Sequence, residues 1–211
     1  MTLSATQHWT LIHAERARLA ALLDTLTAPQ WRSGSLCSIW TVEQVTAHLT
    51  AAAHTGRWGW LRSMVLAGFD SDTHNARRLA EQLGSTPEET RRRFHEAVDL
   101  TIAPTPDHPA WLGEVIVHGQ DIARPLGMAL EPDPMAVLEV ARYFVSKDFA
   151  VNSRTAVRGL HLEADDASFS SGEGPSVRGP LLSLVMAMAG RPGALDELAG
   201  EGVAELRGRI T

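Results

Sequence analysis

The stretch WLGEVIVHGQDIARPLG, residues 111–127, sets a carboxylate and an imidazole one helical turn apart inside an apolar segment. Residues four positions apart on a helix project from the same face, so Glu114 and His118 are expected to be neighbours, with Asp121 one turn further along. The apolar residues around them predict a largely buried helix. An ionised carboxylate is costly there unless it is paired or binds a cation. This stretch alone therefore leaves two interpretations open: a Glu–His pair in the core, or part of a metal site.

The composition is that of a soluble globular protein. The chain has 211 residues, 44% of them hydrophobic and 21% charged, which suffices for one generous domain or for a medium domain with a small one. The formal net charge is -6, and the strongest basic cluster, residues 91–93, lies among acidic residues on a predicted helix. Such a cluster is typical of a solvated helix face, so we expect no nucleic-acid partner.

Membrane and secretion signals are missing from the sequence. No apolar run approaches the ~20 residues that a membrane helix needs. The N-terminus, MTLSATQHWT, does not have the basic-then-apolar layout of a signal peptide. A single cysteine, Cys37, excludes an internal disulfide and fits a reducing compartment. We therefore expect a cytoplasmic protein that has no membrane partner.

Hydrophobic periodicity and helix-start signals predict that the first part of the chain is helical. Ser4 and Thr41 are in the position of N-caps, and Gln44 completes a capping box with Thr41. Residues 85–89, STPEE, form a further strong helix start. Loops are expected over residues 28–39 and 68–73, and helices over 4–26, 41–66, 75–83, 85–103, 111–127 and 133–152. Long helices with short connections predict a helix bundle over residues 1–152.

The character of the sequence changes after this point. Residues 156–164, AVRGLHLEA, alternate as a strand does, and a second short strand is expected around 168–170. A turn over 170–176, a helix over 181–189 and a last, mostly helical piece over 196–209 complete the chain. The predicted fold is therefore mainly α: a four-helix bundle, residues 1–152, followed by a small α+β C-terminal domain, residues 153–211.

The second predicted helix supplies a third candidate ligand. In TVEQVTAHLTAAAH, residues 41–54, His48 shares a face with apolar residues and is expected to point into the bundle. An inward histidine on one helix and an inward Glu/His pair on another are the usual construction of a metal site between helices. His48, Glu114 and His118 would supply three ligands and leave one position open, which is the pattern of a catalytic divalent site.

Several neighbouring polar residues have less specific interpretations. Asp121 could accept a hydrogen bond from the second ring nitrogen of His118 and fix its tautomer, or it could pair with Arg124 along the helix. Cys37 is expected to be a small, inert packing residue. The remaining candidates, His54 and His74, have no clear apolar face and are expected at the surface, with an approach of either to the pocket as the alternative.

The motifs WTVEQVTAHL, residues 40–49, and WLGEVIVHGQDIARPLG, residues 111–127, resemble the mycothiol-dependent maleylpyruvate isomerase family, part of the DinB-like superfamily of four-helix bundles. The resemblance covers most of residues 1–152. The segment GPSVRGPLLSLVMAMAGRPGALDELAGEG, residues 174–202, also looks like the C-terminal domain that many members carry. By position in these motifs, the resemblance implies that His48, Glu114 and His118 bind a divalent metal, usually zinc.

The resemblance also implies a chemistry. Family members use the thiol mycothiol as cosubstrate, and a bound metal favours its thiolate for attack on an electrophilic small molecule. The outcome is cis/trans isomerisation if the thiol leaves, or thiol S-transfer if it stays. Arg191, in the AGRPG turn, matches an arginine that relatives place near the pocket; it would suit a substrate carboxylate, or it serves to terminate a helix.

We therefore expect a metal-dependent, mycothiol-using enzyme that is a monomer or a homodimer. Two alternatives remain at this level. One is a metal-binding or regulatory bundle protein that catalyses no reaction. The other is a metal-assisted hydrolase with water in the open position.

Overall fold

The structure, a computed structural model, describes residues 3–37, 39–68, 70–149 and 151–210. Contacts within the chain group it into two compact units, Met1–Glu131 and Pro132–Thr211. The fold is mainly helical, with a small three-stranded sheet in the C-terminal part, as the sequence predicts. A grouping by contacts does not test which segments fold as domains, so the bounds 1–152 and 153–211 stay predictions.

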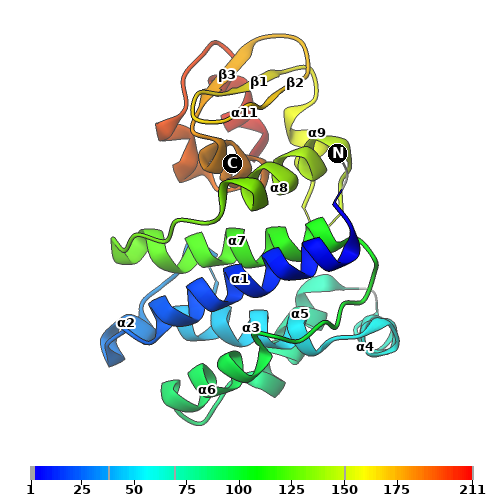
Figure 1. Cartoon of the computed structure of the whole chain (residues 1–211), viewed down its shortest axis with the longest axis vertical. Helices are drawn as coiled ribbons and strands as arrows, with labels where there is room; N and C mark the ends of the chain where they lie inside the picture. Colours follow the sequence, from blue (N-terminus) through cyan, green and yellow to red (C-terminus); the bar gives the residue numbers. More distant parts are fainter. Residues whose placement is uncertain (1–2, 38, 69, 150, 211) are drawn as a thin grey trace. The chain divides into compact units, whose positions relative to one another are not determined.

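Four helices of the first unit form the predicted bundle: α1 (Ala5–Leu23), α3 (Val42–His54), α6 (Pro87–Ala97) and α7 (His108–Ala123). Helix α1 packs against α6 and α7, and α3 packs against the same two helices, so the four close a ring around one core (Figure 1). The core is built from buried apolar side chains of these helices and of the segments between them: Leu19, Ala20, Leu22, Leu23, Trp31, Val42, Val45, Leu49, Phe94, Ile122 and Ala123.

Shorter helices connect the members of the bundle. Helix α2 (Ala28–Arg32) lies in the predicted loop between α1 and α3 and packs on α3. Helix α5 (Ser71–Gln82) also packs on α3, and α4 (Arg57–Leu66) packs on α5. A single 3-10 turn, η1 (Arg124–Leu126), follows α7 and ends at Gly127, whose left-handed φ of 64° suits glycine. The connection from α3 to α6 is therefore long and helical rather than short.

The helix starts confirm the local signals in the sequence. Ser4 accepts a hydrogen bond from the amide of Gln7, whose side chain in turn accepts from the amide of Ser4. Thr41 and Gln44 form the same capping box at α3. Helix α7 begins at His108 and not at the predicted Trp111. Pro109 is tolerated in its first turn because backbone N–H groups there have no partner within the helix.

The helix predicted over residues 41–66 is wrong in one respect, because the chain leaves helical geometry at Thr55 and Gly56, with ψ angles of 103° and 171°. The Thr55 hydroxyl donates to the carbonyl oxygen of Ala51 at 2.6 Å, but Thr46 and Thr50 make the same kind of bond inside α3, so this bond does not by itself end the helix. Glycine at the next position has weak helix propensity. The segment is therefore two helices, α3 and α4.

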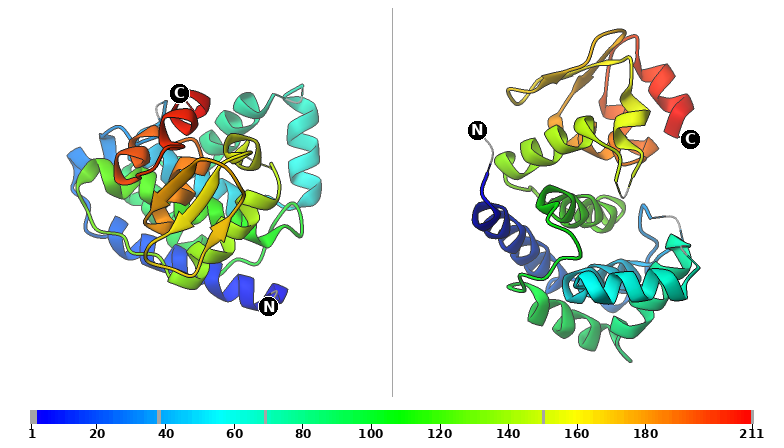
Figure 2. Two further views of the ribbon diagram at one scale, coloured as in Figure 1. Left: turned by 90° about the horizontal axis from the view of Figure 1, so that it is seen from above. Right: turned by 90° about the vertical axis from the view of Figure 1, so that its right-hand side faces the viewer.

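The second unit combines helices with the small sheet. Its helices are α8 (Pro134–Ser146), α9 (Ser153–Val157), α10 (Leu181–Met188) and α11 (Val203–Ile210), with a 3-10 helix, η2 (Pro192–Glu197). In the sheet, β1 (His161–Ala164) pairs antiparallel with β2 (Ser170–Ser171) and parallel with β3 (Ser176–Gly179) (Figure 2). The parallel pair has Leu162 opposite Val177, and α10 packs against both strands.

Two predicted elements of this unit are shorter than expected. The helix predicted to reach residue 152 ends at Ser146, and the Ser153 hydroxyl donates to the carbonyl oxygen of Phe144 at 2.9 Å, near that helix end. Residues 153–157 form α9, so the strand predicted from residue 156 begins only at His161. The predicted turn at 170–176 contains Gly172, where a Cβ would lie 2.2 Å from the carbonyl oxygen of Leu160.

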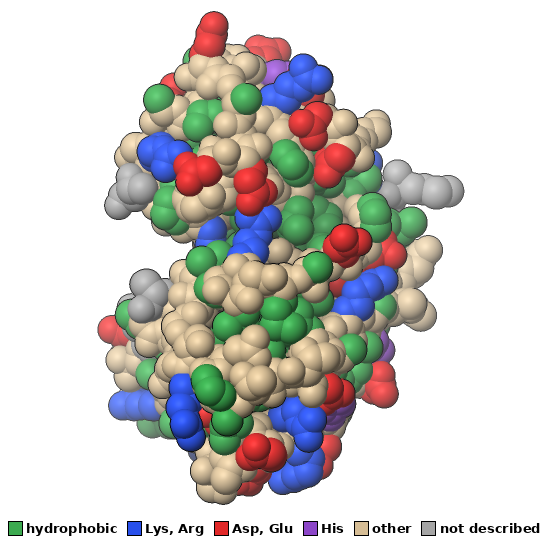
Figure 3. All heavy atoms as spheres, turned by 90° about the vertical axis from the view of Figure 1, so that its left-hand side faces the viewer, with side chains coloured by type: hydrophobic (Ala, Val, Ile, Leu, Met, Phe, Trp, Pro, Cys, Tyr) green, Lys and Arg blue, Asp and Glu red, His purple; other side chains and the backbone are tan. Residues whose placement is uncertain are grey.

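Two expectations from composition concern the surface. On the face drawn in Figure 3, acidic and basic side chains are interspersed. None of the helices in the described ranges is both long enough and apolar enough to span a bilayer. Neither observation tests the expected absence of a nucleic-acid or membrane partner, which stays a prediction.

We expect Arg16→Met to destabilise the bundle. Arg16 on α1 is 4% exposed, and its Nη1 donates to the carbonyl oxygens of Ala97, at 3.2 Å, and Leu100, at 2.8 Å, at the end of α6. Without this charged donor the free energy of unfolding should fall by about 2 kcal/mol. Urea unfolding followed by circular dichroism measures the loss.

The matched control is Arg92→Met. Arg92 lies on α6 with its side chain 58% exposed and pairs with Glu96 at the surface. Its replacement should change the free energy of unfolding by no more than about 0.5 kcal/mol. Equal losses in the two variants would contradict the role assigned to Arg16.

Candidate metal centre

Two helices of the bundle bring three polar side chains together. Helix α3 carries His48, and α7 carries Glu114 and His118 one turn apart. The Nε2 atom of His118 lies 3.1 Å from Glu114 Oε2, and Nε2 of His48 lies 3.7 Å from Glu114 Oε1. Both histidines are buried, and the Glu114 side chain is 21% exposed. One carboxylate thus lies between two ring nitrogens, with a different oxygen closest to each.

The arrangement fits a divalent cation. One ligand atom from each of the three residues can be chosen so that all lie within 4.8 Å of one another. Donor atoms bound tetrahedrally to one zinc ion at ~2.1 Å lie about 3.4 Å apart, and the two measured separations fall on either side of that value. Two imidazoles and a carboxylate are also donor types that zinc takes. That these residues hold a metal stays a proposal.

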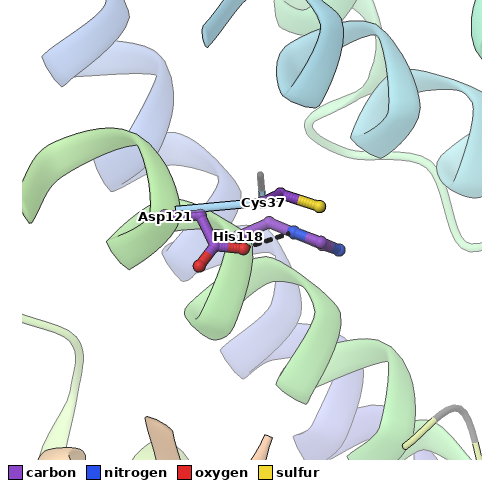
Figure 4. A group of neighbouring side chains, drawn as sticks. All are labelled: Cys37, His118 and Asp121. Carbon is purple, nitrogen blue, oxygen red and sulfur yellow. Dashed lines mark hydrogen bonds and ion pairs between the residues drawn. The ribbon is translucent and has the colours of Figure 1, made fainter. Parts of the chain in front are cut away.

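Asp121 orients one of the two imidazoles. It is fully buried, and its Oδ2 lies 2.9 Å from Nδ1 of His118 (Figure 4). With Nδ1 bonded to Asp121, Nε2 faces Glu114 and is the ring nitrogen available to a cation. The other partner considered for Asp121 was Arg124, whose Nε donates to Gln120 Oε1 at 3.1 Å. The contact with His118 is the one that a metal ligand requires.

Close pairing sets the charges in this group. Burial would raise the pKa of Glu114, but hydrogen bonds with His118 and His48 outweigh burial and hold that pKa well below 4.5. Burial would lower the pKa of His118, but Asp121 and Glu114 raise it to about 9. In the metal-free chain His118 is therefore an imidazolium between two carboxylates. This buried ion pair is the core alternative to a metal site, and a cation at Nε2 would replace the proton.

Trp40, which was given no role from the sequence, forms one wall of the centre. Its ring centroid lies 4.8 Å from that of His48 and 6.4 Å from that of His118, and the two imidazoles are themselves 5.0 Å apart. The residue comes directly before the N-cap of α3, so the start of that helix fixes its position. The only hint of this role in the sequence was an aromatic residue directly before a helix that carries a candidate histidine ligand.

Cys37 lies closer to the centre than the sequence indicated. One ligand atom each from Cys37, His118 and Asp121 fall within 4.8 Å of one another, and Figure 4 shows the three side chains together. The loop that carries Cys37 is tied to α7, because the amide of Leu36 donates to the carbonyl oxygen of Asp121 at 3.0 Å. Its predicted role as an inert packing residue is not tested by this placement.

The other two histidines considered have different environments. His54, at the end of α3, is exposed as predicted. The surface position predicted for His74 is wrong, since its side chain is buried, and its Nδ1 lies 2.8 Å from Ser63 Oγ. Its helix, α5, packs on α3, and the sequence offered no sign of this because α5 has few apolar residues.

Arg191 belongs to the second unit. It is the N-cap residue of η2, its backbone amide donates to the carbonyl oxygen of Met186 at 3.0 Å, and its Nη1 donates to that of Ala189 at 2.6 Å. These bonds serve the end of α10. The pairing of Arg191 with a substrate carboxylate stays a prediction.

The fold and this cluster define a class: four-helix bundles with a candidate metal centre between two of their helices. Residues 12–103 match the family model of the mycothiol maleylpyruvate isomerase N-terminal domain. This match supports the resemblance that the motifs indicate. His48 lies within the matched residues, whereas Glu114 and His118 lie beyond them.

Two solved structures share the fold. A mycothiol-dependent maleylpyruvate isomerase is 18% identical with a TM-score of 0.67, and a histidine-to-alanine mutant of such an isomerase is 17% identical with a TM-score of 0.68. In both cases the match covers 95% of this chain and 96% of the other. At such identities the likeness establishes the fold alone. No curated protein matches the chain in sequence.

Metal-free protein should lose stability as the pH rises above neutrality. The pKa of His118 is about 9 in the folded chain, against an ordinary value of 6.5. Its stabilising effect is therefore complete below about pH 6.5 and is lost as the pH rises through about 9, with a loss of at most about 3 kcal/mol. Urea unfolding of chelator-treated protein at several pH values measures the slope.

Two variants assign this slope. His118→Gln should remove it, because the group that titrates is gone. His95→Gln should keep it, since His95 is 42% exposed and pairs with Asp24 at the surface. Identical slopes for the wild type and His118→Gln would show that the pairing with Asp121 and Glu114 is not as described.

Proposed function

We propose that this chain is a divalent-metal-dependent enzyme that uses mycothiol to act on an electrophilic small molecule. His48, Glu114 and His118 hold the metal, which we take to be zinc. The reaction is a cis/trans isomerisation like that of maleylpyruvate isomerase, or an S-transfer when the thiol stays on the product. The cytoplasmic location and the monomeric or dimeric state expected from the sequence remain part of this proposal.

One observation carries the proposal: the side chains of α3 and α7 converge on the carboxylate of Glu114. The separations of 3.1 Å and 3.7 Å from its oxygens to the two Nε2 atoms suit three ligands of one cation. Three protein ligands leave a position open for a further ligand, as catalytic sites do. The family match and the shared fold support the use of mycothiol at this centre.

When bound, a divalent cation supplies positive charge that favours the thiolate form of a coordinated thiol. Two further residues, Asp121 and Trp40, hold the ligand side chains in position. Asp121 keeps the proton of His118 on Nδ1, so that Nε2 faces Glu114. Trp40 packs against His48 and His118 and shields them on that side.

The thiol chemistry explains how one site can give either product. The thiolate sulfur adds to a carbon of a conjugated double bond, and the π electrons move onto the conjugated carbonyl oxygen. The former double bond can then rotate, and when the electrons return the sulfur leaves with its bonding pair. Isomerisation therefore regenerates the thiol. If the neighbouring carbon is protonated instead, a thioether forms and one thiol is consumed per product.

The metal ligands can be tested by replacement. Purified protein should contain about one divalent ion per chain, and His48→Ala, Glu114→Ala or His118→Ala should each lower its metal affinity at least about tenfold, because one of three ligands is lost. Elemental analysis after dialysis measures the metal content. His54→Ala is the matched control, since His54 lies exposed at the end of the same helix and should leave the content unchanged.

Two outcomes would contradict the metal centre. The first is folded wild-type protein that takes up no zinc, manganese or cobalt from solution. The second is an equal loss of metal in His54→Ala and His48→Ala. Either result would leave the buried ion pair as the account of this cluster.

The use of mycothiol is tested on metal-loaded protein. Mycothiol should bind as measured by calorimetry, and binding should be lost on chelation because the thiolate loses its cation. Addition of conjugated cis-carboxylic acids should then give the trans isomer without thiol loss, or a thioether with stoichiometric thiol loss. Product analysis by NMR separates the two.

Binding of metal without any effect of mycothiol would overturn the thiol chemistry. Turnover of an ester or amide in that case would identify a metal-assisted hydrolase. Bound metal with no turnover of any of these compounds would favour a regulatory bundle protein.

A further inference from the structure

A cavity of about 330 Å³ lies in the first unit between α4 and α5. This volume is within the range of sites for small molecules. The cavity includes none of the residues of the candidate metal centre, and its walls carry three arginines, one glutamate and two large apolar side chains. A cavity of this composition suits a ligand that has an anionic group and an apolar part.

Positive charge is in excess in this cavity. Arg62, Arg77 and Arg78 line it, and Glu81 is the only carboxylate among the lining residues that the structure describes. The side chain of Arg78 is 20% exposed, its Nη1 lies 2.5 Å from Glu81 Oε2, and its Nη2 donates to Thr55 Oγ1 at 3.0 Å. Among the described residues only Arg78 pairs with Glu81, and an excess of guanidinium groups favours a further anion, which a guanidinium can bind through two parallel hydrogen bonds.

One donor of Arg78 has no acceptor within the described residues. Its Nε atom is buried and makes no hydrogen bond there. A buried donor on a charged group is costly to leave unsatisfied. Arg78 therefore lines the cavity with one of its donors still unsatisfied by the described residues.

The apolar part of the lining is exposed to an unusual degree. The side chain of Trp58 is 76% exposed and that of Leu66 is 63% exposed, and α4 has no buried residue. A flat indole beside cationic groups can take a planar ligand by stacking. The carbonyl oxygen of Leu66 accepts a hydrogen bond from Arg77 Nη1 at 2.9 Å, which joins the apolar side to the basic one.

We propose that the cavity between α4 and α5 binds a small planar carboxylate, with its carboxylate at Arg78 and Arg62 and its planar body against Trp58. Ser63 lines the same cavity, and its hydroxyl lies 2.8 Å from Nδ1 of the buried His74. His74 lies on α5, which packs on α3, the helix that carries His48. The new site shares no residue with the candidate metal centre.

The test is calorimetric titration of the full chain with benzoate, a planar carboxylate, after removal of metal by a chelator. Benzoate should bind, and the uncharged analogue benzamide should bind at least about tenfold more weakly because it cannot form the ionic pair. Arg62→Gln and Trp58→Ala should each weaken benzoate binding about tenfold. Because no metal is present, this result does not depend on the proposed function.

A matched control and a second variant make the experiment decisive. Arg92→Gln, an exposed arginine on α6, should bind benzoate as the wild type does. Arg78→Gln should lose binding. This variant also loses the bond to Thr55, so its fold must be checked by circular dichroism. If Arg78→Gln does not fold, Arg62→Gln, at an exposed residue, provides the test.

Three results would overturn the proposal. Undetectable binding of benzoate removes the site. Equal affinity for benzoate and benzamide removes the preference for an anion. Inorganic phosphate that binds as tightly as benzoate, together with no effect of Trp58→Ala, shows a plain anion site without the planar preference.

Discussion

The contact of the half-buried Glu114 carboxylate with two imidazoles is the interaction on which the arrangement of the first unit depends. The charge of the carboxylate inside the bundle is tolerable only if both oxygens have partners, so α3 must present His48 where α7 presents His118. This requirement acts together with the apolar residues that α3 and α7 bury in the same core. Asp121 then orients His118, and the carbonyl of Asp121 accepts from the amide of Leu36, which places the loop ahead of α3.

Stability alone is a weak reason for such a group. A buried ion pair that is replaced by well-packed apolar residues often leaves a protein as stable or more stable. Binding of a cation in place of the proton would stabilise the group much more, because two imidazoles and a carboxylate would then all coordinate one positive ion. This difference is why we propose a ligand set and not a core salt bridge, and Asp121 contacts His118 in either case.

The features that the sequence predicted depend on residues close together in the chain, whereas those that it missed depend on contacts between distant segments. The capping boxes at Ser4 and Thr41 and the apolar periodicity of α7 are local, so they were enough to predict the main helices and to bring His48, Glu114 and His118 together in the expected bundle. The burial of His74 depends on packing between α5 and α3, and the pairing of β1 with β3 joins segments that no local pattern links. These features were beyond reach of the sequence.

The break at Thr55 shows that a missed local feature can build a site. A continuous helix over residues 41–66 would carry α4 onward along the direction of α3 instead of returning it to α5. At this break the Thr55 hydroxyl donates to the carbonyl of Ala51, and its oxygen accepts a hydrogen bond from Arg78. The residue at the break therefore also holds an arginine that lines the new cavity. Periodicity could not show this, because an apolar pattern does not report hydrogen bonds between side chains of different helices.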